Sequence, residues 1–232
     1  MKVAVITVLF DYPDYYTPIF QDKLLDNFPQ EDYYVVRYKS ENEIIRNESY
    51  YFKFTHFRIK NLLDFITSNI SQKYDYFLHL DATDVGYVGG IEKIPQLMME
   101  YDCSILFGGE RNLWPNTDYS HLYENKKTDS LYKYLNAGVF CAETNSFISH
   151  AKEILNRGLS GLCDQGNWQI EYLLNSDIKI DYDNKLVLNS YLAKEDIIIS
   201  DQDLTFKTNK PIFVHDNGGF NDHTIKIVNY FL

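Results

Sequence analysis

Asp81 and Asp84 are the residues whose type and spacing point most directly to chemistry. They follow residues 77–80, a short apolar run typical of a buried strand, and lie three positions apart. A tight turn there would aim both carboxylates at one point, where they repel each other unless a proton or a cation lies between them. Mn²⁺ and Mg²⁺ are hard ions that prefer oxygen ligands. The pair therefore predicts a divalent metal that binds phosphate oxygens, with a capped turn as the alternative, because Asp is a common turn former.

Alternating strand and helix patterns surround this acidic pair. Residues 2–9 form a continuous apolar, β-branched run, which indicates a buried strand, and apolar residues recur at helical spacing within 51–70. Further strands are predicted at residues 33–38, 76–80, 104–108, 137–143, 178–182, 186–188 and 211–214, and further helices at 20–28, 94–99, 145–157, 168–174 and 223–231. Residues 109–130 are typical of a loop, and 158–166 of a turn.

This alternation predicts an α/β fold with a mostly parallel central sheet and helices on both faces. Ligands bind such sheets beyond the carboxyl ends of the strands, so Asp81 and Asp84 are expected at the mouth of a crevice. A length of 232 residues fits one domain. Because no repeat or linker divides the sequence, we expect residues 1–232 to form a single domain.

Composition and charge exclude several partners. The 33 Asp and Glu outnumber the 22 Lys and Arg, a formal net charge of −11, which argues against binding to nucleic acid or to an anionic membrane. The three cysteines form no CxxC pair, which argues against a zinc site and favours reduced thiols in a cytoplasmic protein. No apolar run reaches the roughly 18 residues of a transmembrane segment, and the first residues lead straight into a strand rather than a secretory leader. The sequence leaves the oligomeric state open.

Five short segments occur in an order that resembles a known family. They are residues 78–84 (LHLDATD), 106–110 (LFGGE) with 114–115 (WP), 134–138 (YLNAG), 164–165 (DQ) and 214–218 (VHDNG). In this order they resemble the glycosyltransferase domain of the procollagen lysyl hydroxylases and the related collagen glycosyltransferases, over about residues 3–217. The resemblance implies a Rossmann-like GT-A fold, a UDP-sugar donor carrying glucose or galactose, and a bound Mn²⁺ or Mg²⁺.

The resemblance also implies roles for individual residues. Asp81 and Asp84 become a metal motif spaced DxxD, and His215 becomes the third protein ligand, since imidazole suits Mn²⁺ better than Ca²⁺. Donor-binding roles fall to Thr7 and Phe10 at the nucleoside edge, Arg58 on the long helix, Asp81 at the metal, Asn136 near the donor sugar, and Asn217 and Gly218 in a turn that approaches the diphosphate. Each of these residues also has a plainer interpretation as a turn, packing or surface residue.

The catalytic base depends on the stereochemistry of transfer. An inverting enzyme needs a carboxylate near the acceptor hydroxyl, and Asp164 and Glu110 are the candidates, whereas a retaining enzyme needs no such base. Asp164 is equally well explained as a helix N-cap. Trp114 either stacks on an acceptor sugar or anchors its loop to the body of the protein. The sequence does not choose among these, nor among a glycan, a lipid-linked sugar and a protein side chain as acceptor.

Two other classes of protein compete with a hexosyltransferase. A nucleotidyltransferase also places paired carboxylates on an α/β sheet, but it usually begins with a glycine-rich, basic phosphate loop after the first strand. Residues 10–14 (FDYPD) are acidic and lack glycine, which counts against this class. A non-catalytic sugar-nucleotide-binding module is the second alternative, and the presence of both aspartates together with His215 argues against it.

Overall fold

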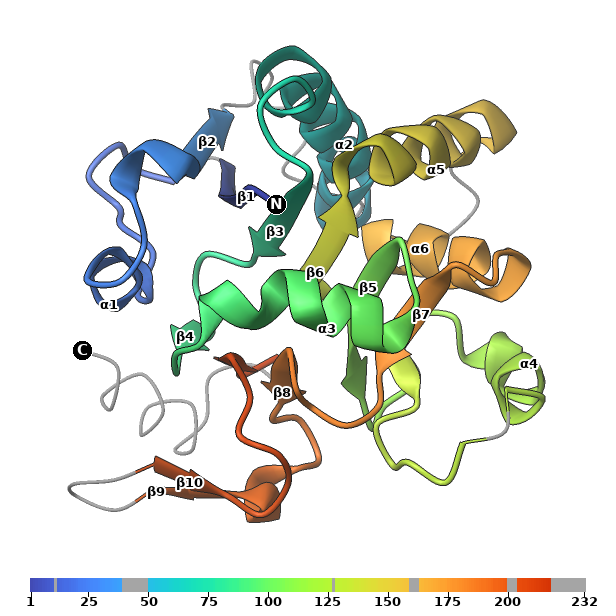
Figure 1. Ribbon diagram of the computed structural model, residues 1–232. Coiled ribbons are helices and arrows are strands. Elements are labelled where there is room, and N and C mark those ends of the chain that lie inside the picture. The colour runs from blue at the N-terminus through green and yellow to red at the C-terminus, as the bar shows by residue number, and fades with distance from the viewer. Residues whose placement is uncertain (11, 39–49, 127, 159–162, 200–203, 218–232) are drawn as a thin grey trace.

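The computed structural model of the chain contains a six-stranded central sheet (Figure 1), and it describes residues 1–10, 12–38, 50–126, 128–158, 163–199 and 204–217, without the side chains of 50–57. The strand order is β2 (Tyr33–Tyr38), β1 (Val3–Phe10), β3 (Tyr76–Leu80), β6 (Tyr134–Glu143), β5 (Ile105–Glu110) and β7 (Ile178–Asp181). Only β6 runs antiparallel to its neighbours in this sheet. The predicted α/β fold with a mostly parallel sheet is therefore confirmed.

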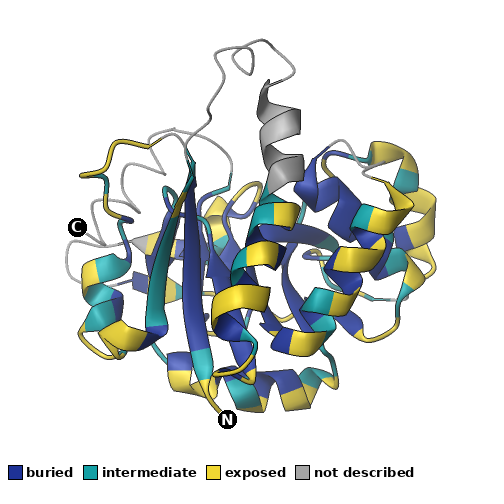
Figure 2. Cartoon of the chain, turned by 90° about the horizontal axis from the view of Figure 1, so that it is seen from above, coloured by how far each residue is buried: buried dark blue, intermediate teal, exposed yellow. Residues whose placement is uncertain are grey.

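Helices cover both faces of this sheet. One face packs against α2 (Tyr50–Phe65), α5 (Thr144–Arg157) and α6 (Asp164–Leu174), and the other against α1 (Gln21–Leu25) and α3 (Ile94–Tyr101). Successive side chains of a strand point to opposite faces, so Phe77 joins the first core and Leu78 the second. Figure 2 shows the dark, buried strands between helices whose outer faces are exposed.

The long helix follows its predicted apolar stripe. Ile59, Leu62, Leu63 and Ile66 are all at most 7% exposed. Burying an aliphatic side chain of this size contributes about 1.5–3 kcal/mol, so the stripe holds α2 to the sheet. The last turn of the predicted helix widens into a π-helical segment at Ile66–Ile70. None of the described helices is both long enough and apolar enough to span a membrane.

A second, three-stranded sheet lies beside the first, in the order β4 (Val85–Tyr87), β11 (Phe213–His215) and β8 (Val187–Asn189). Strand β4 was not predicted, because three residues with a glycine in the middle carry too little pattern to indicate a strand. It begins directly after Asp84 and pairs antiparallel with β11, with Val85 opposite His215. This register brings the acidic pair next to a histidine 131 positions further along the chain.

Several predicted boundaries were wrong. Strand β5 continues through Gly108 and Gly109 to Glu110, β6 begins at Tyr134, and α6 begins at Asp164 rather than 168. Glycine looks like a breaker in the sequence, but a Cβ at Gly109 would lie 2.4 Å from the Tyr132 carbonyl oxygen, so the sheet requires its absence.

The structure also contains short elements that the sequence did not predict. The expected loop at 109–130 holds a 3₁₀ turn, Thr117–Tyr119, and the helix α4 (Ser120–Glu124), while β9 (Ile197–Ile199) and β10 (Leu204–Phe206) pair as a hairpin. Further 3₁₀ turns span Gln30–Asp32, Ile91–Lys93 and Lys194–Asp196. The predicted helix at 223–231 lies outside the described residues.

Candidate active site

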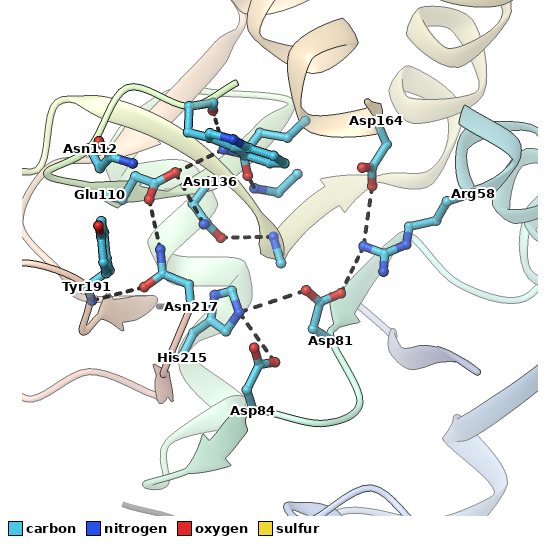
Figure 3. A pocket seen from close by; sticks show the side chains of 14 residues that line it. Arg58, Asp81, Asp84, Glu110, Asn112, Asn136, Asp164, Tyr191, His215 and Asn217 are labelled. Carbon is cyan, nitrogen blue, oxygen red and sulfur yellow. Dashed lines mark hydrogen bonds and ion pairs between the residues drawn. The ribbon is translucent and has the colours of Figure 1, made fainter. Parts of the chain in front are cut away.

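One polar pocket of about 380 Å³ collects most of the predicted site residues at the strand ends (Figure 3). The predicted residues that line it are Arg58, Asp81, Asp84, Glu110, Trp114, Asn136, Asp164, His215 and Asn217. They come from both sheets, from α2 and α6, and from the loop after β5. Most of these strands and helices were predicted locally, β4 excepted, whereas their convergence depends on the order of strands in the two sheets.

Asp81, Asp84 and His215 form a cluster suited to a divalent cation. One ligand atom from each residue lies within 4.8 Å of the others. The Nε2 atom of His215 is 3.5 Å from Asp84 Oδ1 and 3.8 Å from Asp81 Oδ2. Two carboxylates and one imidazole match the ligand preference of Mn²⁺. The residues therefore fit the metal that the sequence predicts.

The backbone around the cluster is built for this close approach. The amide of Asp81 donates to the carbonyl oxygen of Gly138 at 2.7 Å, and the amide of Asp216 donates to that of Asp84 at 2.8 Å. A Cβ on Gly138 would lie 2.2 Å from the His215 ring and 2.8 Å from Asp81 Oδ2. Only glycine at position 138 leaves room for both ligands.

Asn189, at the end of β8, orients the histidine. Its Oδ1 atom lies 2.7 Å from Nδ1 of His215, and its Nδ2 atom donates to the carbonyl oxygen of Gly109 at 2.8 Å. Because that second bond directs Oδ1 toward the ring, Nδ1 donates its proton to Asn189. Nε2 faces the two carboxylates, and although burial opposes protonation, Asp84 and Asp81 raise the pKa of His215, so a metal ion would replace a proton on Nε2. This is how proteins commonly hold a metal-binding histidine. The sequence did not single out Asn189.

Asn189→Ala should weaken Mn²⁺ binding about 10- to 100-fold, the usual cost of losing the partner of a metal-binding histidine. Asn189→Asp should lose much less, because a carboxylate still accepts the Nδ1 proton. Both variants lose the bond to Gly109, so the difference between their Mn²⁺ affinities measures the contribution of the bond that orients the His215 ring. Titration calorimetry with Mn²⁺ measures it, with thermal melting as the check on folding. Equal losses in the two variants would contradict this role.

Arg58 joins the cluster to a second carboxylate. Its guanidinium lies 2.9 Å from Asp81 Oδ1 and 3.3 Å from Asp164 Oδ2. Burial opposes ionisation of Asp81, but Arg58 and the neighbouring histidines outweigh it and hold the pKa of Asp81 below its usual range. Burial dominates at Asp164 and raises its pKa despite Arg58. Arg58 therefore binds Oδ1 of Asp81 and leaves Oδ2 directed at His215. It also forms an ion pair with Asp164.

Glu110 lies on the other side of the pocket, within a cage of side-chain amides. It is 3% exposed. Oε1 accepts from Asn136 Nδ2 at 3.3 Å and from Gln165 Nε2 at 2.9 Å, and Oε2 accepts from Asn217 Nδ2 at 2.8 Å. Burial raises the pKa of Glu110 to about 7, although the amides favour its charged form. A carboxyl with this pKa exchanges a proton near neutral pH.

The loop that carries Trp114 is tied to the start of α6. Gln165 and Gln169 both donate to the Trp114 carbonyl oxygen, at 2.6 and 2.8 Å, and Asn116 donates to that of Gly166 at 3.1 Å. The Trp114 side chain meanwhile lines the pocket. The backbone thus anchors the loop while the indole faces the pocket, so the two interpretations of Trp114 are compatible.

The predicted nucleoside edge lies apart from the pocket lining. Thr7 Oγ1 donates to the Leu80 carbonyl oxygen at 2.8 Å and is fully buried, so it braces β1 against β3. Phe10 pairs in register with Tyr38 at the end of β1. Burial and the nearby Asp84 carboxylate raise the pKa of Tyr12, which places this phenol on the Asp84 side of the site. Gly218 lies outside the described residues.

Five lining residues received no role of their own from the sequence: Asn112, Ala137, Gly138, Gln165 and Tyr191. Ala137, Gly138 and Gln165 appeared only as parts of short motifs. Tyr191 follows β8, and nothing in the residues around it indicates a site. Its position depends on the bond from its own amide to Asn217 and on the bond from Arg111 to the Leu192 carbonyl oxygen, and both partners are distant in sequence.

Comparisons with solved structures agree with this architecture. The structure described as "crystal structure of a glycosyltransferase involved in the glycosylation of the major capsid of PBCV-1" is 12% identical, with a TM-score of 0.56, over 100% of this chain and 99% of its own. The apo structure of WbbM, a bifunctional glycosyltransferase, is 10% identical, with a TM-score of 0.53, over 98% of this chain and 49% of its own. The fold is thus one that glycosyltransferases use, which confirms the predicted GT-A class.

Comparisons of amino-acid sequence found fewer similar proteins than comparisons of structure. No protein-family model matches the chain. The uncharacterized protein R699 of Acanthamoeba polyphaga mimivirus is 26% identical over 120 residues, which are 50% of this chain and 25% of that protein. The matched region thus spans a quarter of this relative's length.

Proposed function

We propose that the protein is a metal-dependent glycosyltransferase that moves a hexose, glucose or galactose, from a UDP-sugar to an acceptor hydroxyl. The observation that carries the proposal is the convergence of Asp81, Asp84 and His215 in one polar pocket of a glycosyltransferase fold. The collagen-type resemblance and the cytoplasmic location stay predictions.

The donor occupies the side of the pocket that holds the metal ligands. Asp81 Oδ2, Asp84 and His215 Nε2 would hold Mn²⁺ or Mg²⁺, which would supply a Lewis acid to neutralise the charge of the leaving diphosphate. Arg58 keeps Asp81 ionised and oriented through its other oxygen. We propose that Tyr12, whose phenol feels the charge of Asp84, contacts the nucleoside. These residues bind and orient the donor before the glycosidic bond breaks.

The acceptor hydroxyl lies near Glu110, which acts as the base. As the new bond from the acceptor oxygen to the anomeric carbon forms, the hydroxyl proton passes to Glu110 and the bond to UDP breaks. Asp164 is less suited to this step because it is paired with Arg58. A base in this position favours inversion at the anomeric carbon.

Titration calorimetry with UDP tests the donor site. UDP should bind with Mn²⁺ present and at least about tenfold more weakly after chelation, because its diphosphate is held through the metal. UDP-glucose and UDP-galactose should then slowly release UDP without any acceptor. Binding without release would favour a non-catalytic sugar-nucleotide module, and absence of binding in both conditions would contradict the proposal.

A further inference from the structure

The pocket has an aromatic rim on its Glu110 side. Trp114 and Tyr191 line the pocket and are 37% and 36% exposed. In Figure 3 Tyr191 lies beside Asn217 and Glu110, away from Arg58 and Asp164. Both aromatic side chains therefore offer an accessible ring to a ligand in the pocket. The position of Tyr191 puts this surface next to the proposed base rather than next to the metal ligands.

Tyr191 is held in place by its backbone. Its amide donates to Asn217 Oδ1 at 3.0 Å, and the neighbouring Ser190 amide donates to the His215 carbonyl oxygen at 2.9 Å. Leu192 has a positive φ of 58°, and Arg111 donates to its carbonyl oxygen at 2.8 Å. The same Asn217 that donates to Glu110 therefore positions Tyr191. These bonds fix the backbone at Tyr191, so less conformational entropy is lost when its ring packs against a ligand.

The side chains that line the pocket disfavour two kinds of acceptor, one with an alkyl chain and one with acidic or phosphate groups. Among the described residues that line the pocket, the largest aliphatic side chain is Ala137, so an alkyl chain finds little to pack against. Four carboxylates, on Asp81, Asp84, Glu110 and Asp164, face one arginine and one histidine. A phosphorylated or acidic acceptor would meet this negative charge, which disfavours a diphosphate lipid.

A neutral sugar ring fits the aromatic and amide side chains of this lining. A pyranose has an apolar face of C–H groups and an edge of hydroxyls, so it stacks on an aromatic ring while amides bind its edge. Side-chain amides of Asn112, Asn136 and Asn217 line the same pocket. We propose that the acceptor is a neutral carbohydrate whose terminal ring stacks on Tyr191, with Trp114 lining the same subsite. This rests on the proposed glycosyl transfer and names its acceptor class.

Fluorescence separates this proposal from the donor site. The chain has two tryptophans, of which Trp168 is 3% exposed and Trp114 is accessible, so iodide quenching reports on Trp114. The probes are methyl glucosides, methyl galactosides, lactose, maltose and cellobiose. Glucuronic-acid disaccharides, serine- and threonine-containing peptides and decyl phosphate serve as comparisons. At least one neutral sugar should protect Trp114 from iodide, and the comparison compounds should not.

Variants at position 191 test the stacking surface. Tyr191→Ala should raise the half-saturating concentration of the protecting sugar about tenfold, whereas Tyr191→Phe, which keeps the ring, should change it less than about threefold. Tyr15→Ala, which removes a ring that is 86% exposed and does not line the pocket, should behave as wild type. Tyr191→Ala should therefore lose affinity for the sugar, whereas its affinity for UDP in the presence of Mn²⁺ should match that of wild type.

The outcomes distinguish the two proposals. If UDP binds with Mn²⁺ but no neutral sugar protects Trp114, or Tyr191→Ala binds sugar like wild type, the acceptor proposal is overturned and the donor site stands. Protection by the peptide or decyl phosphate alone overturns it in favour of a protein or lipid acceptor. If UDP fails to bind, the proposed function falls and the acceptor proposal falls with it.

Discussion

Asp84→Ala is expected to abolish Mn²⁺-dependent UDP binding and, with it, sugar transfer. Asp84 is one of the three proposed ligands, and its removal should cost more than the 10- to 100-fold that follows when only the partner of a ligand is lost. The Asp84 side chain is 29% exposed, and it is the backbone carbonyl that bonds to the Asp216 amide, so the variant should still fold. Calorimetric titration of Mn²⁺, and then of UDP, measures the loss.

The chain provides a matched control in a second cluster. His150, Glu153 and Glu171 also have ligand atoms within 4.8 Å of one another. Both nitrogens of His150 are already engaged, by Glu171 at 2.8 Å and by Asp177 at 3.1 Å, so this cluster is a structural network. Glu153→Ala should therefore bind Mn²⁺ and UDP as wild type does. If Glu153→Ala loses binding and Asp84→Ala keeps it, the metal lies elsewhere than we propose.

Glu110→Gln is expected to lower kcat about 10²- to 10⁴-fold, the usual contribution of a positioned base. Glu110 must be ionised to accept a proton, and its pKa in the free protein is about 7, so wild-type kcat/KM should rise with pH through neutrality and level off above it. Glutamine cannot ionise, so the variant should lack this rise. Its UDP affinity should stay near that of wild type, because Glu110 does not contact the metal ligands.

A profile of kcat/KM against pH for wild type, Glu110→Gln and Asp164→Asn decides between the two carboxylates. Asp164→Asn should retain the rise through neutrality and show its main defect in donor binding, through Arg58. Should the rise disappear in Asp164→Asn and persist in Glu110→Gln, Asp164 is the base and the assignment made here is wrong.

Local pattern was enough to predict the elements that carry the site. The apolar run before Asp81 predicted β3, and the spacing of the two aspartates predicted a shared ligand. The carboxyl end of a strand is set by the same residues that form the strand, so the edge at which Asp81 and Asp84 lie followed from the sequence. Gly109 and Glu110 show the limit, since the polar stretch that begins there indicated a loop, whereas the sheet makes both residues part of β5.

The sequence by itself determined the fold class, the acidic pair and the type of ligand that pair favours. The tertiary structure alone decided which distant residues meet there: Asn189 behind His215, the three amides around Glu110, and Tyr191 held by Asn217. Strand and helix formation depend on the periodicity of neighbouring residues, which can be read along the chain. Contacts across the sheets depend on strand order and register, and in this chain a three-residue strand, β4, sets the register that joins Asp84 to His215.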